Sequence, residues 1–126
     1  HFLFIAGGVG ITPIMSMLRY LRDTGDDRPA VLIYGNKTAD DIIFASELDQ
    51  MADHVRIVHV LSRPDAAWTG PKGHITRAII EESAGESLAT CHVFLCGPVA
   101  MMDAVLVELK KAHVDRRRIH YERFTI

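Results

Sequence analysis

Short apolar runs alternate with longer stretches of helical periodicity along the whole chain of 126 residues. The apolar runs, which predict β-strands, lie at 2–6, 30–35, 55–61, 91–96 and 118–121. The stretches that predict helices lie at 13–23, 41–52, 75–83 and 99–112. Strands that alternate with helices form a parallel sheet with helices on both of its faces. The expected fold class is therefore α/β, a three-layer, five-stranded parallel sheet flanked by helices.

The length and composition of the chain are those of one domain. A chain of this length with 48% hydrophobic residues can bury a sizeable core, and we expect a single domain over 1–126. The net charge of −2 offers no electrostatic basis for contact with nucleic acid or with an anionic membrane. The chain opens on an apolar run without a starting Met, so we expect it to be part of a longer protein.

Two cysteines, Cys91 and Cys96, are too few for a disulfide framework. Their odd spacing within one predicted strand should send them to opposite faces of the sheet. Unpaired thiols are typical of a reducing compartment, which favours a cytoplasmic location. Such a location also suits the cytoplasmic domain of a membrane protein. The seven His residues lack the close spacing of metal ligands, so no metal site is predicted.

The start of the chain combines an apolar run, a glycine-rich turn and the beginning of a helix. Gly7, Gly8 and Gly10 permit positive φ and a close approach to the backbone. Thr12 can cap the following helix, and Pro13 suits its first turn. The unpaired N–H groups and positive dipole end of such a helix attract an anion such as phosphate. The turn lacks both the G-x-G-x-x-G fingerprint and the Lys of a Walker loop, so a tight turn without a ligand is the alternative.

Glycine-rich, polar or sulfur-bearing residues follow four of the five predicted strands. These loops lie at 7–10, 35–37, 62–64 and 96–98. In open parallel sheets, ligands bind outside the carboxyl ends of the strands, near the point where the strand order reverses. The four loops therefore predict one nucleotide-sized site at that edge of the sheet.

Stretches at these strand ends resemble the NAD(P)-binding domain of the ferredoxin–NADP reductase family of flavin-dependent oxidoreductases. The matching motifs are GGVGITP at 7–13, YGN at 34–36, FLCGP at 94–98 with Met101 and Met102, and YERF at 121–124. The resemblance implies a Rossmann-like nucleotide-binding domain of ferredoxin reductase type, preceded by a flavin-binding barrel in the same protein. It implies hydride transfer from NAD(P)H to FAD or FMN, bound mainly by that barrel. Electrons would then pass to an iron–sulfur protein, a haem or a ferric ion.

The resemblance also implies roles for individual residues. Cys96 would lie near the hydride-carrying carbon and Glu122 near the nicotinamide and flavin, so both are candidate catalytic residues. The candidate cofactor-binding residues are Gly7, Gly8, Val9, Gly10, Ile11, Thr12, Pro13, Gly35, Asn36, Ser62, Arg63, Gly97, Pro98, Met101 and Phe124. Phe124 would cover the flavin ring. The alternatives are a buried Cys96 that only fills a strand end and a frayed C-terminus.

The choice between NADH and NADPH depends on the ribose end of the site. An acidic residue usually follows the second strand in NAD-binding domains, but Asn36 and Lys37 stand there. Ser62 and Arg63 match the pair with which the family grips a 2′-phosphate, and Arg suits that group. NADPH is therefore slightly favoured over NADH. The alternative is that Arg63 is a solvated loop charge or contacts adenine.

These observations predict the nicotinamide-binding half of a flavin-dependent reductase. Its expected partners are a flavin-binding domain in cis and a downstream electron acceptor, with no nucleic acid and no membrane contact by this domain. The fragment should bind the nucleotide weakly and be inactive without its flavin domain. The main alternative is a non-catalytic, nucleotide-binding regulatory module. A flavodoxin-like FMN carrier is a weaker alternative, because the glycine turn contains no Ser or Thr hydroxyl.

Overall fold

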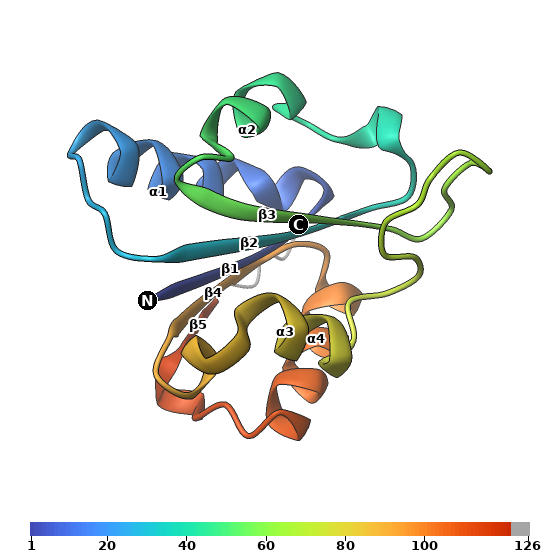
Figure 1. Cartoon of the computed structure of the whole chain (residues 1–126). Coiled ribbons are helices and arrows are strands. Elements are labelled where there is room, and N and C mark those ends of the chain that lie inside the picture. The colour runs from blue at the N-terminus through green and yellow to red at the C-terminus, as the bar shows by residue number, and fades with distance from the viewer. Residues whose placement is uncertain (122–126) are drawn as a thin grey trace.

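A five-stranded, all-parallel sheet lies between two helical layers in the computed structural model, which describes residues 1–121 (Figure 1). The strands are β1 (Phe2–Gly7), β2 (Ala30–Asn36), β3 (Val55–Leu61), β4 (His92–Cys96) and β5 (Ile119–Tyr121). Their order in the sheet is β3-β2-β1-β4-β5, and every neighbouring pair is parallel. Strands β2 and β3 are added on one side of β1, and β4 and β5 on its other side. The strand order therefore reverses between β1 and β4, as in doubly wound nucleotide-binding folds. The predicted fold class is confirmed.

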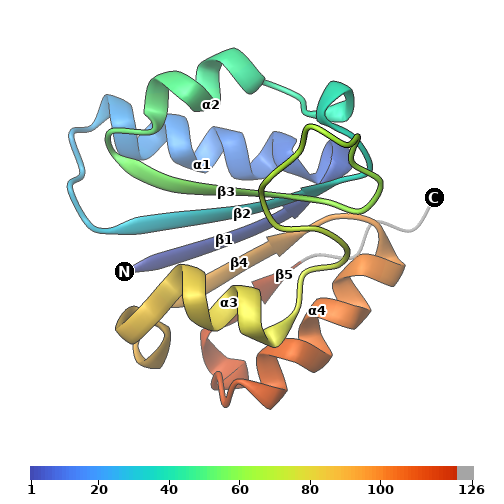
Figure 2. The ribbon, with the colours of Figure 1, turned by 45° about the vertical axis from the view of Figure 1, so that its right-hand side comes forward.

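Two helices cover each face of the sheet (Figures 1 and 2). The helices of one face are α1 (Ile11–Asp23) and α2 (Ala45–Met51), and those of the other are α3 (Arg77–Ala84) and α4 (Val99–Lys111). Short 3-10 helices lie in four of the connections between strands and α-helices. They are η1 (Gly8–Gly10), η2 (Ala39–Asp41), η3 (Gly85–Ala89) and η4 (Arg116–Arg118). The segment after β3 loops over the carboxyl ends of the strands before α3 begins (Figure 2).

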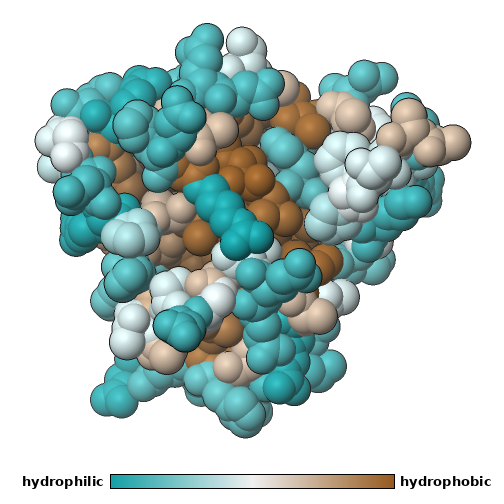
Figure 3. Space-filling view, in the orientation of Figure 1, coloured by the Kyte–Doolittle hydropathy of each residue, from teal (hydrophilic) through white to brown (hydrophobic). Residues whose placement is uncertain are grey.

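The alternating side chains of β1 enter two separate hydrophobic cores. Leu3 and Ile5 pack beneath α3 and α4, whereas Phe4 and Ala6 pack beneath α1 and α2. A strand covered on both faces needs apolar residues at every position, which explains the unbroken apolar run. Cys91 and Cys96 lie in different cores, as their odd spacing predicts. In Figure 3, apolar side chains reach the surface mainly between the two helical layers, where the edge of the sheet lies.

Helix α1 begins two residues earlier than predicted. Its N-cap is Gly10, and no side chain caps it, so the expectation that Thr12 is the capping residue is wrong. The reason is that η1 runs directly into α1, which places Thr12 inside the first turn. The buried stripe of α1 consists of Ile11, Ile14, Met15 and Leu18, whereas Met17 is 38% exposed.

The second helix begins later than predicted. Asp41 closes a capping box with Thr38 and thereby forms the separate turn η2 instead of starting the long helix. Phe44 then adopts a left-handed conformation with φ of 61°, and α2 begins only at Ala45. The buried residues of α3 are Ile80 and Ser83, and Ala78 is exposed.

Replacing His113 with Gly should raise the free energy of unfolding by about 1 kcal/mol. His113 follows the end of α4 with φ of 62°, a left-handed conformation that costs little for glycine. The local hydrogen bonds from Val114 N–H to Leu109 O (3.1 Å) and from His113 N–H to Lys110 O (3.0 Å) hold this conformation. Urea unfolding measures the change. Ala112→Gly, at a φ of −83°, is the control and should lower stability; a less stable His113→Gly would contradict the expectation.

Candidate nucleotide-binding site

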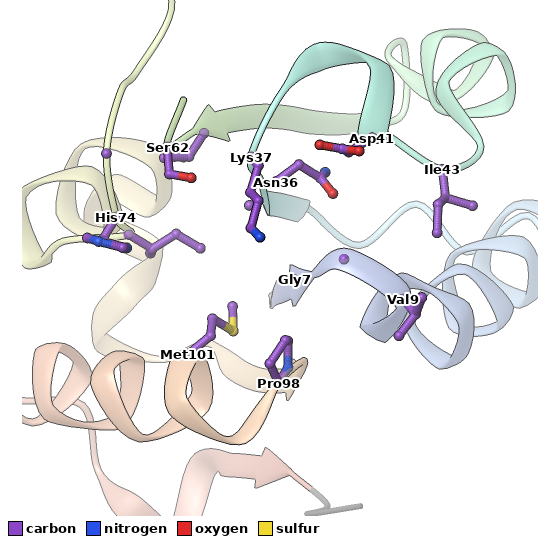
Figure 4. Close-up of a pocket in the computed structure, with 15 residues that line it drawn as sticks. Gly7, Val9, Asn36, Lys37, Asp41, Ile43, Ser62, His74, Pro98 and Met101 are labelled. Carbon is purple, nitrogen blue, oxygen red and sulfur yellow. The ribbon is translucent and has the colours of Figure 1, made fainter. Parts of the chain in front are cut away.

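A cavity of about 440 Å³ opens at the carboxyl ends of β1, β2 and β3, beside the start of α4 (Figure 4). Several of the predicted cofactor-binding residues line it. They are Gly7, Gly8, Val9, Gly35, Asn36, Ser62, Pro98 and Met101. The cavity therefore brings together the loops after the first three strands and the turn after β4, as the parallel topology predicts.

The glycine turn after β1 forms one wall of this cavity. Gly8 has a φ of +52°, and a Cβ built there would have no atom within 4 Å, so the turn is open toward a ligand. Val9 is 76% exposed at the rim. Because η1 continues into α1, the N–H groups of this turn belong to the first turn of a helix and have no acceptor within it. The turn thus fits a phosphate in backbone geometry and in the sign of its partial charge.

Glycines also allow the turn after β1 to touch the turn after β4. A Cβ on Gly10 would lie 2.7 Å from Gly97 Cα and closer still to the Cys96 carbonyl oxygen. A Cβ on Gly7 would lie 3.1 Å from the Met101 sulfur, and one on Gly97 only 2.8 Å from it. The two turns are therefore packed backbone to backbone, with the Met101 thioether fitted against both. This packing sets the distance between the glycine turn and the α4 end of the cavity.

A buried tyrosine supports the glycine turn from below. Tyr34, on β2, is fully buried, and its hydroxyl donates a hydrogen bond to the Gly8 carbonyl oxygen (2.8 Å). The Ile43 N–H donates to the same hydroxyl at 3.4 Å. Burial raises the pKa of Tyr34, while the nearby Ile43 N–H and Asn36 amide act in the opposite direction. With its pKa above the ordinary value of 10, the hydroxyl stays protonated and acts as a donor near neutral pH.

An acidic residue stands at the rim formed by the loop after β2. Asp41 Oδ2 accepts hydrogen bonds from the Thr38 N–H (3.1 Å) and the Thr38 hydroxyl (2.9 Å), which holds the carboxylate in place. Lys37 extends toward the middle of the cavity, on the side of Gly7 (Figure 4). The Asn36 side-chain nitrogen is buried and has no hydrogen bond of good geometry among the described residues. This rim therefore offers a ligand an acceptor at Asp41 and a cation at Lys37.

Other predicted site residues do not line the cavity. These are Gly10, Ile11, Thr12, Pro13, Arg63, Cys96 and Gly97. Ile11 is fully buried in the core, and Cys96 is 7% exposed at the end of β4 on the α1 face. Arg63 is exposed. Its backbone N–H donates a hydrogen bond to the Lys37 carbonyl oxygen in the neighbouring loop at 2.8 Å. Glu122 and Phe124 lie outside the described residues.

Sequence reasoning did not assign several residues that line the cavity. These are Asp41, Ile43, Val60, Gly73 and Ile75, whereas Lys37 belongs to the predicted loop at 35–37. A T-x-x-D capping pattern directly after a strand was the available signal for Asp41. No comparable signal exists for Gly73, because its loop folds back onto the end of β3 through backbone hydrogen bonds. Leu61 N–H donates to Pro71 O (3.2 Å), and Gly73 N–H donates to Leu61 O (2.9 Å).

The strand order, the glycine turn and the cavity at the carboxyl edge define a dinucleotide-binding α/β domain. The chain belongs to the oxidoreductase NAD-binding domain family, whose pattern it matches over residues 4–106. Its relatives are cytochrome b5 reductases, ferredoxin reductases and similar enzymes. The resemblance to ferredoxin–NADP reductase-type domains is thereby confirmed.

Individual relatives show how much of each protein the similarity covers. The chain is 33% identical over 127 residues to the nitrate reductase [NADPH] of Emericella nidulans, covering 95% of this chain and 14% of that protein. It is 38% identical over 118 residues to NADH-cytochrome b5 reductase 1 of Debaryomyces hansenii, covering 90% of this chain and 40% of that protein. The cytochrome b5 reductase domain of Ulva prolifera nitrate reductase superposes with a TM-score of 0.87 at 26% identity. The superposition covers 96% of this chain and 49% of that chain. The chain thus spans well under two thirds of these curated relatives.

Two further properties concern the described part of the chain. None of the helices within residues 1–121 is both long and apolar enough to cross a bilayer. Over the same residues, no three or more His, Cys, Asp or Glu side chains are grouped so that they could hold a metal ion.

Proposed function

We propose that this domain binds NADH at the carboxyl edge of its sheet and presents the nicotinamide to a flavin held by another domain of the same protein. The observation that carries this proposal is the cavity into which the glycine turn, the loop after β2 and the start of α4 all open. Family membership supports a nicotinamide nucleotide as the ligand. When bound, the nicotinamide supplies a hydride, and the flavin accepts it.

The diphosphate of the ligand is proposed to rest on the turn at Gly8 and Val9. Both residues line the cavity, and the first turn of a helix presents N–H groups and positive partial charge to an anion. Lys37 extends toward the same region and adds a full positive charge (Figure 4). These groups bind and orient the nucleotide and take no part in proton transfer.

The nicotinamide end is proposed to lie against Pro98 and Met101, which form the apolar wall at the start of α4. Apolar walls exclude water from a hydride-transfer site. Cys96, directly before this turn, remains a candidate for contact with the reacting ring. Glu122 and Phe124 keep the catalytic and flavin-covering roles that the family resemblance implies.

The ribose of the adenosine half is proposed to carry a free 2′-hydroxyl. Asp41 lines the cavity, and a carboxylate accepts hydrogen bonds from ribose hydroxyls but repels a 2′-phosphate. Of the pair that favoured NADPH in the sequence, Ser62 lines the cavity and Arg63 does not. These two observations support NADH over NADPH.

In a calorimetric titration, the 126-residue chain should bind AMP at least about fivefold more tightly than 2′-phospho-AMP, because two like unit charges about 4 Å apart repel by about 1 kcal/mol even in bulk water. Cytidine monophosphate is the control for unspecific phosphate binding and should bind more weakly than AMP. Tighter binding of 2′-phospho-AMP would return the choice to NADPH. No binding of either adenosine ligand would contradict the proposed site itself.

The electron acceptor of the whole protein is proposed to be a one-electron carrier, such as an iron–sulfur protein, a haem or a ferric ion. The relatives named above, nitrate reductase and cytochrome b5 reductase, support this class of protein. Because the flavin is proposed to sit on another domain, the 126-residue chain should bind nucleotide and show no NADH oxidation. Oxidation of NADH by the chain alone would contradict this division of labour.

A further inference from the structure

We propose that Tyr34 is a positioning residue for the nucleotide: its hydroxyl holds the Gly8 carbonyl toward the core and so turns the Val9 N–H toward the ligand's diphosphate. This inference rests on the proposed function, since it assigns the residue that orients the diphosphate-binding turn.

The hydroxyl of Tyr34 connects two walls of the cavity that are far apart in the sequence. It donates to Gly8 O at 2.8 Å and accepts from Ile43 N–H at 3.4 Å, and both Gly8 and Ile43 line the cavity. Tyr34 itself is fully buried and does not line the cavity. It therefore influences a ligand through the groups that its hydroxyl meets, of which Gly8 O and Ile43 N–H are the hydrogen-bonded ones.

A hydroxyl is suited to this double contact because it has one proton and two lone pairs. The proton goes to Gly8 O, which leaves the lone pairs for the Ile43 N–H. A phenylalanine ring would fill the same space and make neither hydrogen bond. The two contacts can thus be removed without opening a cavity in the core.

The orientation of the peptide between Gly8 and Val9 decides what the ligand meets. In a trans peptide, the C=O and the N–H point in opposite directions. A Gly8 carbonyl held toward Tyr34 therefore directs the Val9 N–H away from the core, and Val9 lies on the cavity wall. A reversed peptide would present a carbonyl oxygen to the diphosphate and repel it.

This peptide needs a restraint because glycine permits the reversed orientation. Gly8 sits at φ of +52°, with open space around the position of a Cβ, so no side chain opposes a rotation of the peptide. The Ile11 N–H also bonds to Gly8 O at the start of α1. Tyr34 holds the Gly8 carbonyl from the core side. Among the described residues, its hydroxyl is the side-chain group that donates a hydrogen bond to this carbonyl.

Tyr34→Phe should weaken the binding of ADP-ribose to the 126-residue chain about fivefold, the fold-change that corresponds to one neutral hydrogen bond. Binding of AMP, which lacks the diphosphate, should change less than twofold. Tyr20→Phe is the matched control, because Tyr20 is 68% exposed on α1 and distant from the cavity lining. Its affinities for both ligands should equal those of the wild type. Calorimetry gives the affinities, and urea unfolding shows whether the variants are folded.

A second measurement needs no variant. In ¹⁵N-resolved NMR spectra of the wild-type chain, the Val9 amide proton should shift on addition of ADP-ribose and respond less to AMP. A Val9 amide that does not respond overturns the proposal, as does a Tyr34→Phe chain with unchanged affinity. Equal weakening of ADP-ribose and AMP also overturns it, because Tyr34 would then act on the fold in general. A wild-type chain that binds no ADP-ribose overturns the proposed function as well.

Discussion

Replacing Gly10 with Ala should lower the free energy of unfolding by about 3 kcal/mol, the upper end of the usual cost of overpacking. A Cβ at Gly10 would lie 2.7 Å from Gly97 Cα and closer to the Cys96 carbonyl oxygen. These are backbone atoms at the end of a central strand, so they cannot move aside as a flexible side chain would. The two turns would have to separate, with loss of packing around Met101.

The expected loss of stability is opposite in sign to the effect of helix propensity at this position. Gly10 has φ of −63° and ψ of −8° at the start of α1, where alanine would otherwise stabilise the chain by up to about 1 kcal/mol. Urea unfolding measures the difference. Gly35→Ala is the control: its Cβ would meet the Ile75 side chain at 3.4 Å and the Ala6 carbonyl oxygen at 3.9 Å, both ordinary van der Waals distances, and stability should change by less than about 1 kcal/mol. A Gly10→Ala chain as stable as the wild type would mean that the two turns do not touch.

Asp41→Asn should increase the affinity for 2′-phospho-AMP about tenfold or more. Two unit charges 4 Å apart interact by about 1 kcal/mol in bulk water and about 4 kcal/mol near a protein surface, and a phosphate carries more than one charge. Asparagine keeps the shape of the side chain, and its amide oxygen can still accept the Thr38 hydrogen bonds of 3.1 and 2.9 Å. The affinity for AMP should fall slightly, because a neutral acceptor bonds the ribose more weakly.

Calorimetric titration of both ligands tests this expectation. Asp40→Asn is the matched control, since Asp40 is the adjacent exposed carboxylate and does not line the cavity. It should shift either affinity less than twofold. If Asp41→Asn and Asp40→Asn behaved alike, Asp41 would act only through the overall charge of the loop and not as a group that selects the ribose.

The elements of the fold were predictable because each has its own local signal. The strands β1 and β2 are buried on both faces, and this makes them continuous apolar runs that need no knowledge of their partners. The errors occurred where two local preferences compete. Thr38 and Asp41 form a separate turn instead of the start of α2, and Thr12 lost its capping position to a preceding 3-10 turn.

The site was predictable only where it depends on single loops. The turn at Gly7, Gly8 and Val9 follows a strand directly, so its place at the carboxyl edge follows from topology. Asp41 and His74 reach the cavity through a capping box and a folded-back loop. The capping box joins residues only three apart, but it competes with the start of a longer helix. The loop before His74 is held by hydrogen bonds back to Leu61, which no local pattern indicates.

The sequence by itself determined the layers of this domain, the edge of the sheet that carries the site, and the family resemblance, because hydrophobic periodicity and glycine-rich turns are local properties. Only the tertiary structure decided which side chains meet in the cavity and which backbone groups turn toward it. The contacts between Gly10 and Cys96 and between Tyr34 and Gly8 join separate strands. Such contacts form when the sheet assembles, so no local pattern encodes them.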